Sequence, residues 1–258
     1  MYGGPLGPGE ALAIFAAGAG AGAINSVVGS GSLITFPVLL AFGYPPVLAN
    51  VSNNIGIVPG NVSGVVGYRA ELAGQRGRLL RLGAVSVAGS LVGGLMLLEL
   101  PAHAFQVIVP VLILIACGLV TVQPWVNRWL AARRNPDGRR RADGGPALAA
   151  GVFGTGIYGG YFGGAQGVLL IGLLGTFLDD GLQRINAAKN VLVTGVNLTA
   201  AALFIALARV NWVLAALIAA GSVIGGLAGA RLGRRLPPVA LRCIVVVVGV
   251  VAAVHMLT

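Results

Sequence analysis

Apolar runs about as long as a membrane-spanning helix recur along the whole chain and constrain its fold more than any other feature. A helix needs roughly 20 mostly apolar residues to cross a bilayer. Only 9% of the 258 residues are charged and 57% are hydrophobic, whereas soluble domains carry about 25% charged residues. The sequence therefore predicts an all-α integral membrane protein. Six ordinary spans are expected at 50–68, 83–98, 104–123, 186–207, 212–230 and 239–257.

The chain is also internally duplicated. GAINSVVG at 22–29 matches GIYGGYFG at 156–163, and GSLVGG at 89–94 matches GSVIGG at 221–226. Such ordered matches indicate one structural unit used twice. We therefore predict a first repeat at 1–123, a basic linker at 124–146 and a second repeat at 147–258. The polar positions that match at one constant spacing are Asn50, Asn54, Asn61 and Ser63 with Asn186, Asn190, Asn197 and Thr199.

Each half begins with a Gly-rich apolar stretch that is broken by a tip of small residues, GSGS at 29–32 and GGAQG at 163–167. The arms that follow, 33–42 and 168–178, are too short to cross a bilayer. We interpret each broken stretch as a helical hairpin that enters the membrane and returns, with two short crossing helices as the alternative. Three spans follow each hairpin, which gives about 8–10 membrane segments.

The basic residues predict the orientation, because cytoplasmic loops of membrane proteins are enriched in Lys and Arg. An odd number of crossings in each half places three basic groups in the cytoplasm and leaves Arg209 outside. An even number would place the four arginines of the last group outside and Arg209 inside, so four residues against one favour the odd number. The halves are then inverted copies in a plasma (inner) membrane, with both termini outside. The formal net charge of +10 thus belongs to membrane loops, and no nucleic acid partner is expected. The cytoplasmic arginines would be Arg69, Arg76, Arg78 and Arg81, then Arg128, Arg133, Arg134, Arg139, Arg140 and Arg141, then Arg231, Arg234, Arg235 and Arg242.

The two tips are the first candidate site. Inverted repeats with broken helices are the architecture of many secondary transporters, whose sites lie at the repeat interface. A helix that starts at such a tip presents unpaired N–H groups and a positive dipole end, which attract an anion. The alternative is that the glycines only permit a tight turn or close packing. The candidate binding residues are Gly29, Ser30, Gly31, Ser32, Gly163, Gly164 and Gln166.

A polar stripe on the following helix is the second candidate. Asn50, Asn54 and Asn61 fall on one helical face, and Asn186, Asn190 and Asn197 repeat the pattern. Amides in lipid are costly unless bonded, so these should face the bundle interior. They could bind substrate, bond between helices, or, for Asn50 and Asn186, cap a helix.

Asn53 corresponds in the second half to Lys189, the single lysine of the chain. Lys189 could neutralise an anionic substrate or extend to the membrane surface. All the acidic residues fall in predicted loops or at span ends, and His103, His255, Cys117 and Cys243 form no cluster. We therefore expect no metal, no cofactor and no enzyme activity. The acidic residues are Glu10, Glu71, Glu99, Asp137, Asp143, Asp179 and Asp180.

Two segments resemble the signatures of the TauE/SafE family of sulfite and organosulfonate exporters, also called the toluene sulfonate uptake permease family. They begin AGAINSVVGSGSLITFP at 21–37 and GIYGGYFGGAQGVLLIG at 156–172. The first has the family's GxG tip and Pro37, whereas the second has GGAQG and no such proline. The resemblance implies transport of small sulfur-containing anions or related organic anions. Together with the repeats, it predicts a secondary transporter that exports a small anion (sulfite, a sulfonate or a carboxylate) by alternating access. Alternatives are an anion channel, an uptake carrier for small organic acids, or a structural membrane protein. A homodimer is compatible with the sequence.

Overall fold

The computed structural model describes residues 6–132, 144–232 and 238–257 of the chain. Every regular element in these ranges is a helix. Five of the helices are long and apolar enough to cross a membrane, within α1, α4, α5, α8 and α9. The prediction of an all-α, multi-pass membrane protein is confirmed.

The described helices follow one order in both halves of the chain: a first helix, a short second helix, and then three longer ones. The first half contains α1 (Pro8–Val27), α2 (Ser32–Ala41), α3 (Pro46–Gly67), the 3₁₀ helix η1 (Arg69–Leu72), α4 (Arg76–Glu99) and α5 (Ala102–Ala132). The second half contains α6 (Gly145–Tyr161), α7 (Gln166–Phe177), α8 (Leu182–Leu207), α9 (Trp212–Leu232) and α10 (Pro238–Leu257).

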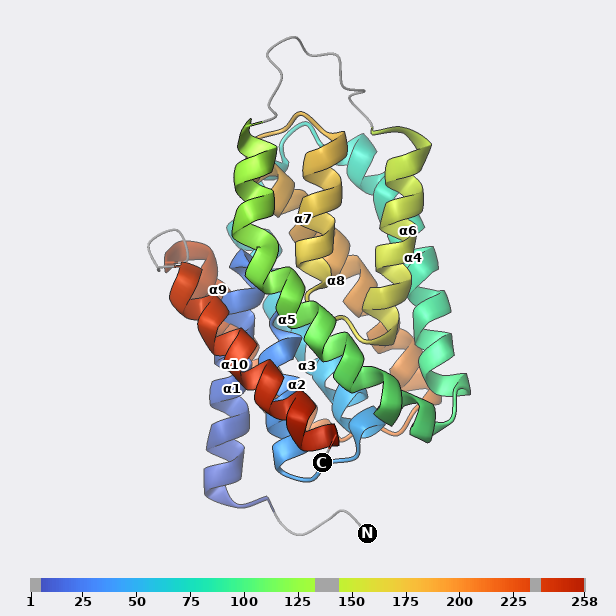
Figure 1. Cartoon of the computed structure of the whole chain (residues 1–258), viewed down its shortest axis with the longest axis vertical. Helices are drawn as coiled ribbons and strands as arrows, with labels where there is room; N and C mark the ends of the chain where they lie inside the picture. The colour runs from blue at the N-terminus through green and yellow to red at the C-terminus, as the bar shows by residue number, and fades with distance from the viewer. Residues whose placement is uncertain (1–5, 133–143, 233–237, 258) are drawn as a thin grey trace.

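Helical hairpins stand at both predicted positions. α1 and α2 pack against each other, as do α6 and α7, and the turns of the two hairpins meet near the middle of the molecule (Figure 1). Each turn uses a left-handed residue, with φ of 86° at Gly29 and 77° at Gly163. Glycine adopts this conformation at little cost. The second turn adds Ala165 at φ 58°, a conformation that costs an alanine roughly 1–2 kcal/mol.

Three of the predicted spans differ in detail from the helices observed. The span expected at 239–257 is helical as α10, but it is represented among the described side chains only by the shorter apolar helix Val245–Val254. The span expected at 50–68 is helical as α3, but α3 is not among the five helices apolar enough to cross, because its buried asparagines lower its hydropathy. α5 continues past the predicted boundary at 124 to Ala132, with Pro124 inside the helix. Proline is tolerated there because neighbouring groups in membrane bundles can satisfy the freed carbonyl. Positions 133–143 of the predicted linker lie outside the described residues.

Helices of the two halves pack on each other reciprocally. α1 packs against α9 and α6 packs against α4, while α3 also contacts α9 and α8 also contacts α4. Glycines of the duplicated GSxxGG motif permit this approach: a Cβ on Gly93 would lie 1.9 Å from the carbonyl oxygen of Ile157, and one on Gly225 would lie 1.8 Å from that of Ala19. Small residues are the usual means of close helix packing in membranes.

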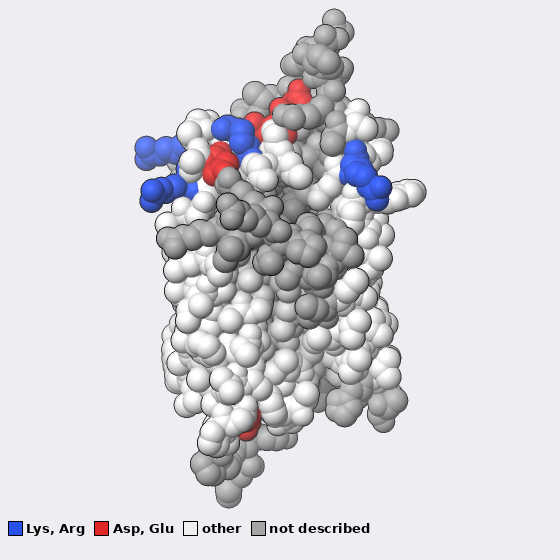
Figure 2. Space-filling model, turned by 90° about the vertical axis from the view of Figure 1, so that its left-hand side faces the viewer, with Lys and Arg blue, Asp and Glu red and all other residues white. Residues whose placement is uncertain are grey.

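The two ends of the molecule differ in charge. The face in Figure 2 has its described Lys and Arg side chains gathered at one end, where α7 ends and α8 begins in Figure 1. The start of α1 and the end of α10 lie at the opposite end (Figure 1). The residues 133–141 and 234–235 that were predicted to add to the basic end lie outside the described residues, as do the side chains of Arg231 and Arg242.

Candidate functional site

The two hairpin tips touch each other. The backbone N–H of Gly167 donates to the carbonyl oxygen of Gly29 over 3.1 Å. A Cβ on Gly29 would lie 2.6 Å from the Cα of Gly167, and one on Gly167 would lie 2.5 Å from the Cα of Gly29. Both positions therefore require glycine for the tips to meet. Gly167 was not among the predicted site residues, although it belongs to the GGAQG tip.

Most backbone donors at the starts of α2 and α7 are already used. The N–H groups of Leu33 and Ile34 donate to Ser30 and Gly31, and those of Gln166 and Val168 donate to Gly163 and Ala165. The predicted anion site thus has fewer free donors than a plain helix start would offer. Among the described residues, four N–H groups at the tips keep no acceptor, those of Ser30, Ser32, Gly164 and Ala165.

Two tip side chains carry buried polar atoms without a partner. Ser30 and Gln166 are each 1% exposed. The Ser30 Oγ and the Gln166 Oε1 have no hydrogen-bond partner among the described residues, although the Gln166 amide donates to the Thr155 carbonyl oxygen over 3.1 Å. Buried polar groups normally find a partner. The Ser30 hydroxyl is therefore available to donate to a ligand, whereas the Gln166 Oε1 is available only as an acceptor.

Lys189 lies directly against the tips. Its side chain is 0% exposed, and its Nζ donates to the backbone carbonyl of Asn25 over 3.1 Å. Its Cδ would lie 3.3 Å from a Cβ on Gly29 and 3.0 Å from one on Gly167. The side chain is thus buried at the meeting point of both hairpins, which argues against the alternative that it extends to the membrane surface.

Asparagines of each half bond to the first hairpin helix of the other. Asn50 of α3 donates to the carbonyl oxygen of Tyr161, at the end of α6, over 3.0 Å. Asn186 and Asn190 of α8 donate to that of Ser26, near the end of α1, over 3.3 and 3.4 Å. The last carbonyls of a helix lack intrahelical partners. Asn50 and Asn186 lie inside α3 and α8, so the capping of their own helices was a wrong alternative.

Among the remaining asparagines of the stripe, some amide atoms are hydrogen-bonded and others have no partner. Asn61 accepts from the Asn25 amide, and Asn53 accepts from the Thr35 hydroxyl. Asn54 Oδ1, Asn61 Nδ2 and Asn186 Oδ1 are buried without a partner among the described residues, and Asn197 is 6% exposed.

Asn25 and Thr35 were missed by the sequence reasoning. Asn25 also accepts from the Gly31 N–H over 3.4 Å, so it ties the first tip to α1 as well as to α3. The signal for Asn25 was present, since it is a polar residue of the repeated segment just before the first tip.

The chemistry of this centre suits an anion. Its single charged side chain is a lysine, and among the described residues no carboxylate contacts the Nζ. Within that same part of the chain, no group of three or more His, Cys, Asp or Glu side chains could hold a metal ion. The ammonium, the free backbone N–H groups and the Ser30 hydroxyl are donors, whereas the unpartnered Gln166 Oε1 is an acceptor. Such donors recognise negatively charged oxygen atoms.

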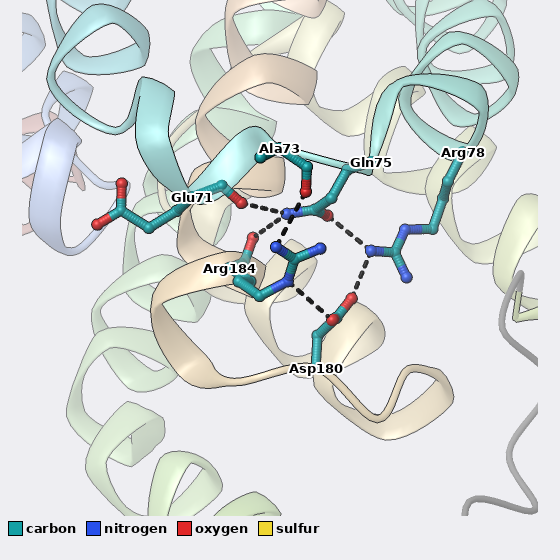
Figure 3. Close-up of polar contacts among 6 residues, drawn as sticks. All are labelled: Glu71, Ala73, Gln75, Arg78, Asp180 and Arg184. Carbon is teal, nitrogen blue, oxygen red and sulfur yellow. Dashed lines mark hydrogen bonds and ion pairs between the residues drawn. The ribbon is translucent and has the colours of Figure 1, made fainter.

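A second polar cluster joins the halves at the basic end (Figure 3). Asp180, in the turn between α7 and α8, accepts from Arg78 of α4 and from Arg184 of α8, the latter over 3.0 Å. Gln75 accepts from Arg78 over 2.7 Å and donates to the carbonyl oxygens of Glu71 and Arg184. This cluster fastens the start of α4 to the second hairpin.

Electrostatics within this basic-end cluster favour the ionised carboxylate. Burial alone would raise the pKa of Asp180, but hydrogen bonds from Arg78 and Arg184 and their charges outweigh it and hold the pKa below its ordinary value. A depressed carboxyl pKa stabilises the structure above the ordinary pKa, and that stabilisation is lost as the pH falls through the depressed value. The junction should therefore weaken in strong acid.

Comparisons with known proteins agree on one family. The family described as sulfite exporter TauE/SafE matches residues 14–256. The probable membrane transporter protein YfcA of Escherichia coli (strain K12) is 27% identical over 239 residues, which cover 92% of this chain and 86% of that protein. The probable membrane transporter protein ORF9 of Sinorhizobium sp. is 24% identical over 245 residues, covering 95% and 91%. No solved structure matches the chain.

Proposed function

The chain belongs to the TauE/SafE family of membrane transporters, and we propose that it carries a small anion through a site formed by the hairpin tips and Lys189. The observation that carries this proposal is Lys189 itself, fully buried between both tips with one neutral acceptor. Charged side chains inside membranes are rare and mark substrate pathways. The free N–H groups at the tips and the Ser30 hydroxyl would complete the site.

The proposed substrate is sulfite or an organosulfonate, with small carboxylates as the neighbouring class. An oxyanion of this kind presents several negatively charged oxygens to donors arriving from different sides. The tips provide donors from two directions, because one tip comes from each half. The family's description as a sulfite exporter supports the same class of substrate, and export is the proposed direction when the anion accumulates inside the cell.

We propose alternating access between two inverted repeats. The reciprocal packing of α1 on α9 and of α6 on α4 supports this relation, as does the exchange of asparagine bonds between the halves. In such transporters one repeat rocks against the other around a fixed site. The Arg78–Asp180 contact would have to open for the halves to part at the basic end.

The proposed orientation places the basic end in the cytoplasm and both termini outside the plasma (inner) membrane. It is supported by the gathering of basic side chains at one end (Figure 2), away from the end where α1 starts (Figure 1), and by their usual cytoplasmic bias. Single cysteines at Gly138 and at Gly3 would test it in intact cells after Cys117 and Cys243 are replaced by serine. Labelling of both positions from the same side would contradict the inverted arrangement.

Ligand-dependent thermal stabilisation of the purified protein tests the function itself. A bound ligand raises stability by mass action. We expect sulfite, thiosulfate, methanesulfonate, sulfoacetate or a small carboxylate to raise the melting temperature, and Ser30→Ala to reduce the rise. Ser63→Ala is the matched control, since the Ser63 hydroxyl bonds within its own helix to Gly60. If no anion of this panel stabilised the wild type, the structural role of a non-transporting membrane protein would be favoured.

A further inference from the structure

Lys189 sits where its protonated form needs a partner that the described residues do not provide. Its Nζ is buried, and its single acceptor is the uncharged carbonyl of Asn25, 3.1 Å away. An ammonium taken out of water is costly unless an opposite charge lies beside it. A neutral amine at the same place keeps the hydrogen bond and avoids most of that cost. The charge on Lys189 therefore depends on what else occupies the site.

The surrounding ionisable groups do not supply the missing charge. Glu10 of α1 accepts from Tyr44, and Asp180 is engaged by Arg78 and Arg184. Among the described residues, none of the ionisable groups on the elements around α8 is hydrogen-bonded or ion-paired with Lys189. These groups are Arg69 and Glu71 of η1, Arg76, Arg78, Arg81 and Glu99 of α4, Tyr158 and Tyr161 of α6, Tyr68 after α3, Asp179 and Asp180 before α8, and Arg184 of α8.

Resting on the proposed anion site, we infer that the transporter is a proton–anion symporter in which Lys189 is the proton carrier. As the anion enters, the neutral amine takes one proton from water, and the ammonium and anion face each other as an ion pair. The two leave together on the other side, when the N–H bond breaks and the proton returns to water. The amine then crosses back without charge.

The coupling predicts the direction in which anion affinity changes with pH. Because protonation and anion binding stabilise each other, each raises the affinity for the other by the same factor. Anion affinity should fall as the pH rises through the range in which the empty site loses its proton. A monovalent anion crosses with no net charge, so the pH gradient drives it from the acidic to the alkaline side. Export then requires an anion gradient that exceeds the opposing proton gradient.

Isothermal titration in pairs of buffers with different ionisation enthalpies measures the coupled proton directly. Methanesulfonate and thiosulfate serve as probes, because neither changes its own charge at neutral or alkaline pH. In alkaline buffer we expect the wild type to take up about one proton per anion bound, and in acidic buffer an uptake near zero, since the amine is then already protonated. Arg209→Gln, which removes an exposed positive charge, should behave as the wild type does.

Lys189→Arg separates the charge from the proton. A guanidinium stays protonated throughout this range, so this variant should bind the anion without proton uptake and with an affinity that does not change with pH. If it fails to fold, the wild-type titrations decide alone. Wild-type binding with no proton uptake in any buffer would overturn the coupling and leave the anion site standing. Failure of every anion of the panel to bind would overturn the proposed function itself, and the coupling with it.

Discussion

Asn53 on α3 and Lys189 on α8 occupy equivalent positions in the two halves, and their surroundings differ. Asn53 is 1% exposed and accepts from the Thr35 hydroxyl of its own hairpin. Lys189 is 0% exposed and reaches across to Asn25 of α1, just before the tip of the other hairpin. The duplicated scaffold thus holds an uncharged amide on one side and the single charged group of the centre on the other.

The tips differ in the same way. The first tip presents the hydroxyl of Ser30, while the second has Gly164 at the equivalent place and the amide of Gln166 beyond it. What the halves share is the geometry that brings the tips together, including a left-handed glycine in each. The repeated geometry thus forms the place where a ligand can bind, and the residues that differ between the halves determine the charge of that place.

The largest effect is expected where the shared geometry is broken. Gly29→Ala places a Cβ 2.6 Å from the Cα of Gly167 and forces an alanine to φ 86°. We expect the free energy of unfolding to fall by about 2–5 kcal/mol, from the conformational penalty and the clash together. Transport should be lost. Thermal melting in detergent and uptake into proteoliposomes measure the two.

Gly43→Ala is the matched control for that variant. Gly43 has φ 81° and an open site, with no atom within 4 Å of an added Cβ. It should therefore cost only the conformational penalty of about 1–2 kcal/mol and keep transport. Equal losses in the two variants would mean that the contact between the tips does not contribute to stability.

A smaller effect is expected at the basic end, where Asp180 bonds to Arg78 of the first half and to Arg184 of the second. Asp180→Asn removes the charged acceptor of Arg78 and Arg184 and should lower the stability by roughly 1–2 kcal/mol, between the values for exposed ion pairs and for buried charged hydrogen bonds. The pKa of Asp180 is below its ordinary value, so the difference from wild type should be present at neutral pH and vanish as acid protonates the carboxylate. Melting curves from neutral to strongly acidic pH would show it, and a constant difference at every pH would contradict this account.

The smallest effects test the symmetry of the scaffold. Asn50→Ala and Asn186→Ala each remove one bond to a terminal carbonyl of the opposite hairpin. Each should lower the free energy of unfolding by about 1 kcal/mol. The two values should be similar if the halves are equivalent at these positions. Melting temperatures of the two variants provide the comparison. A cost confined to one of them would show that the halves differ in packing as well as in charge.

The sequence predicted the helical membrane fold and the hairpins, because apolar length and small-residue breaks are local properties of the chain. It placed the asparagines inside the bundle, since a duplicated polar stripe in an apolar chain needs partners. For Lys189 it left two positions open, and the structure has the buried one. It could not predict the partners themselves. The bond from Asn50 to Tyr161 and that from Lys189 to Asn25 depend on how one half packs on the other. The end of α5 at Ala132 was missed because Pro124 resembled a helix break.

Binding of an anion by Lys189, held between the tips, can be measured by isothermal titration. Thiosulfate or methanesulfonate is titrated into detergent-solubilised protein at two salt concentrations. Lys189→Gln should weaken binding by roughly 1–3 kcal/mol, about 5- to 150-fold, as the loss of a charge-assisted hydrogen bond predicts. Arg209→Gln should bind as the wild type does at both salt concentrations. Unchanged affinity in Lys189→Gln would remove this residue from the site and contradict the account.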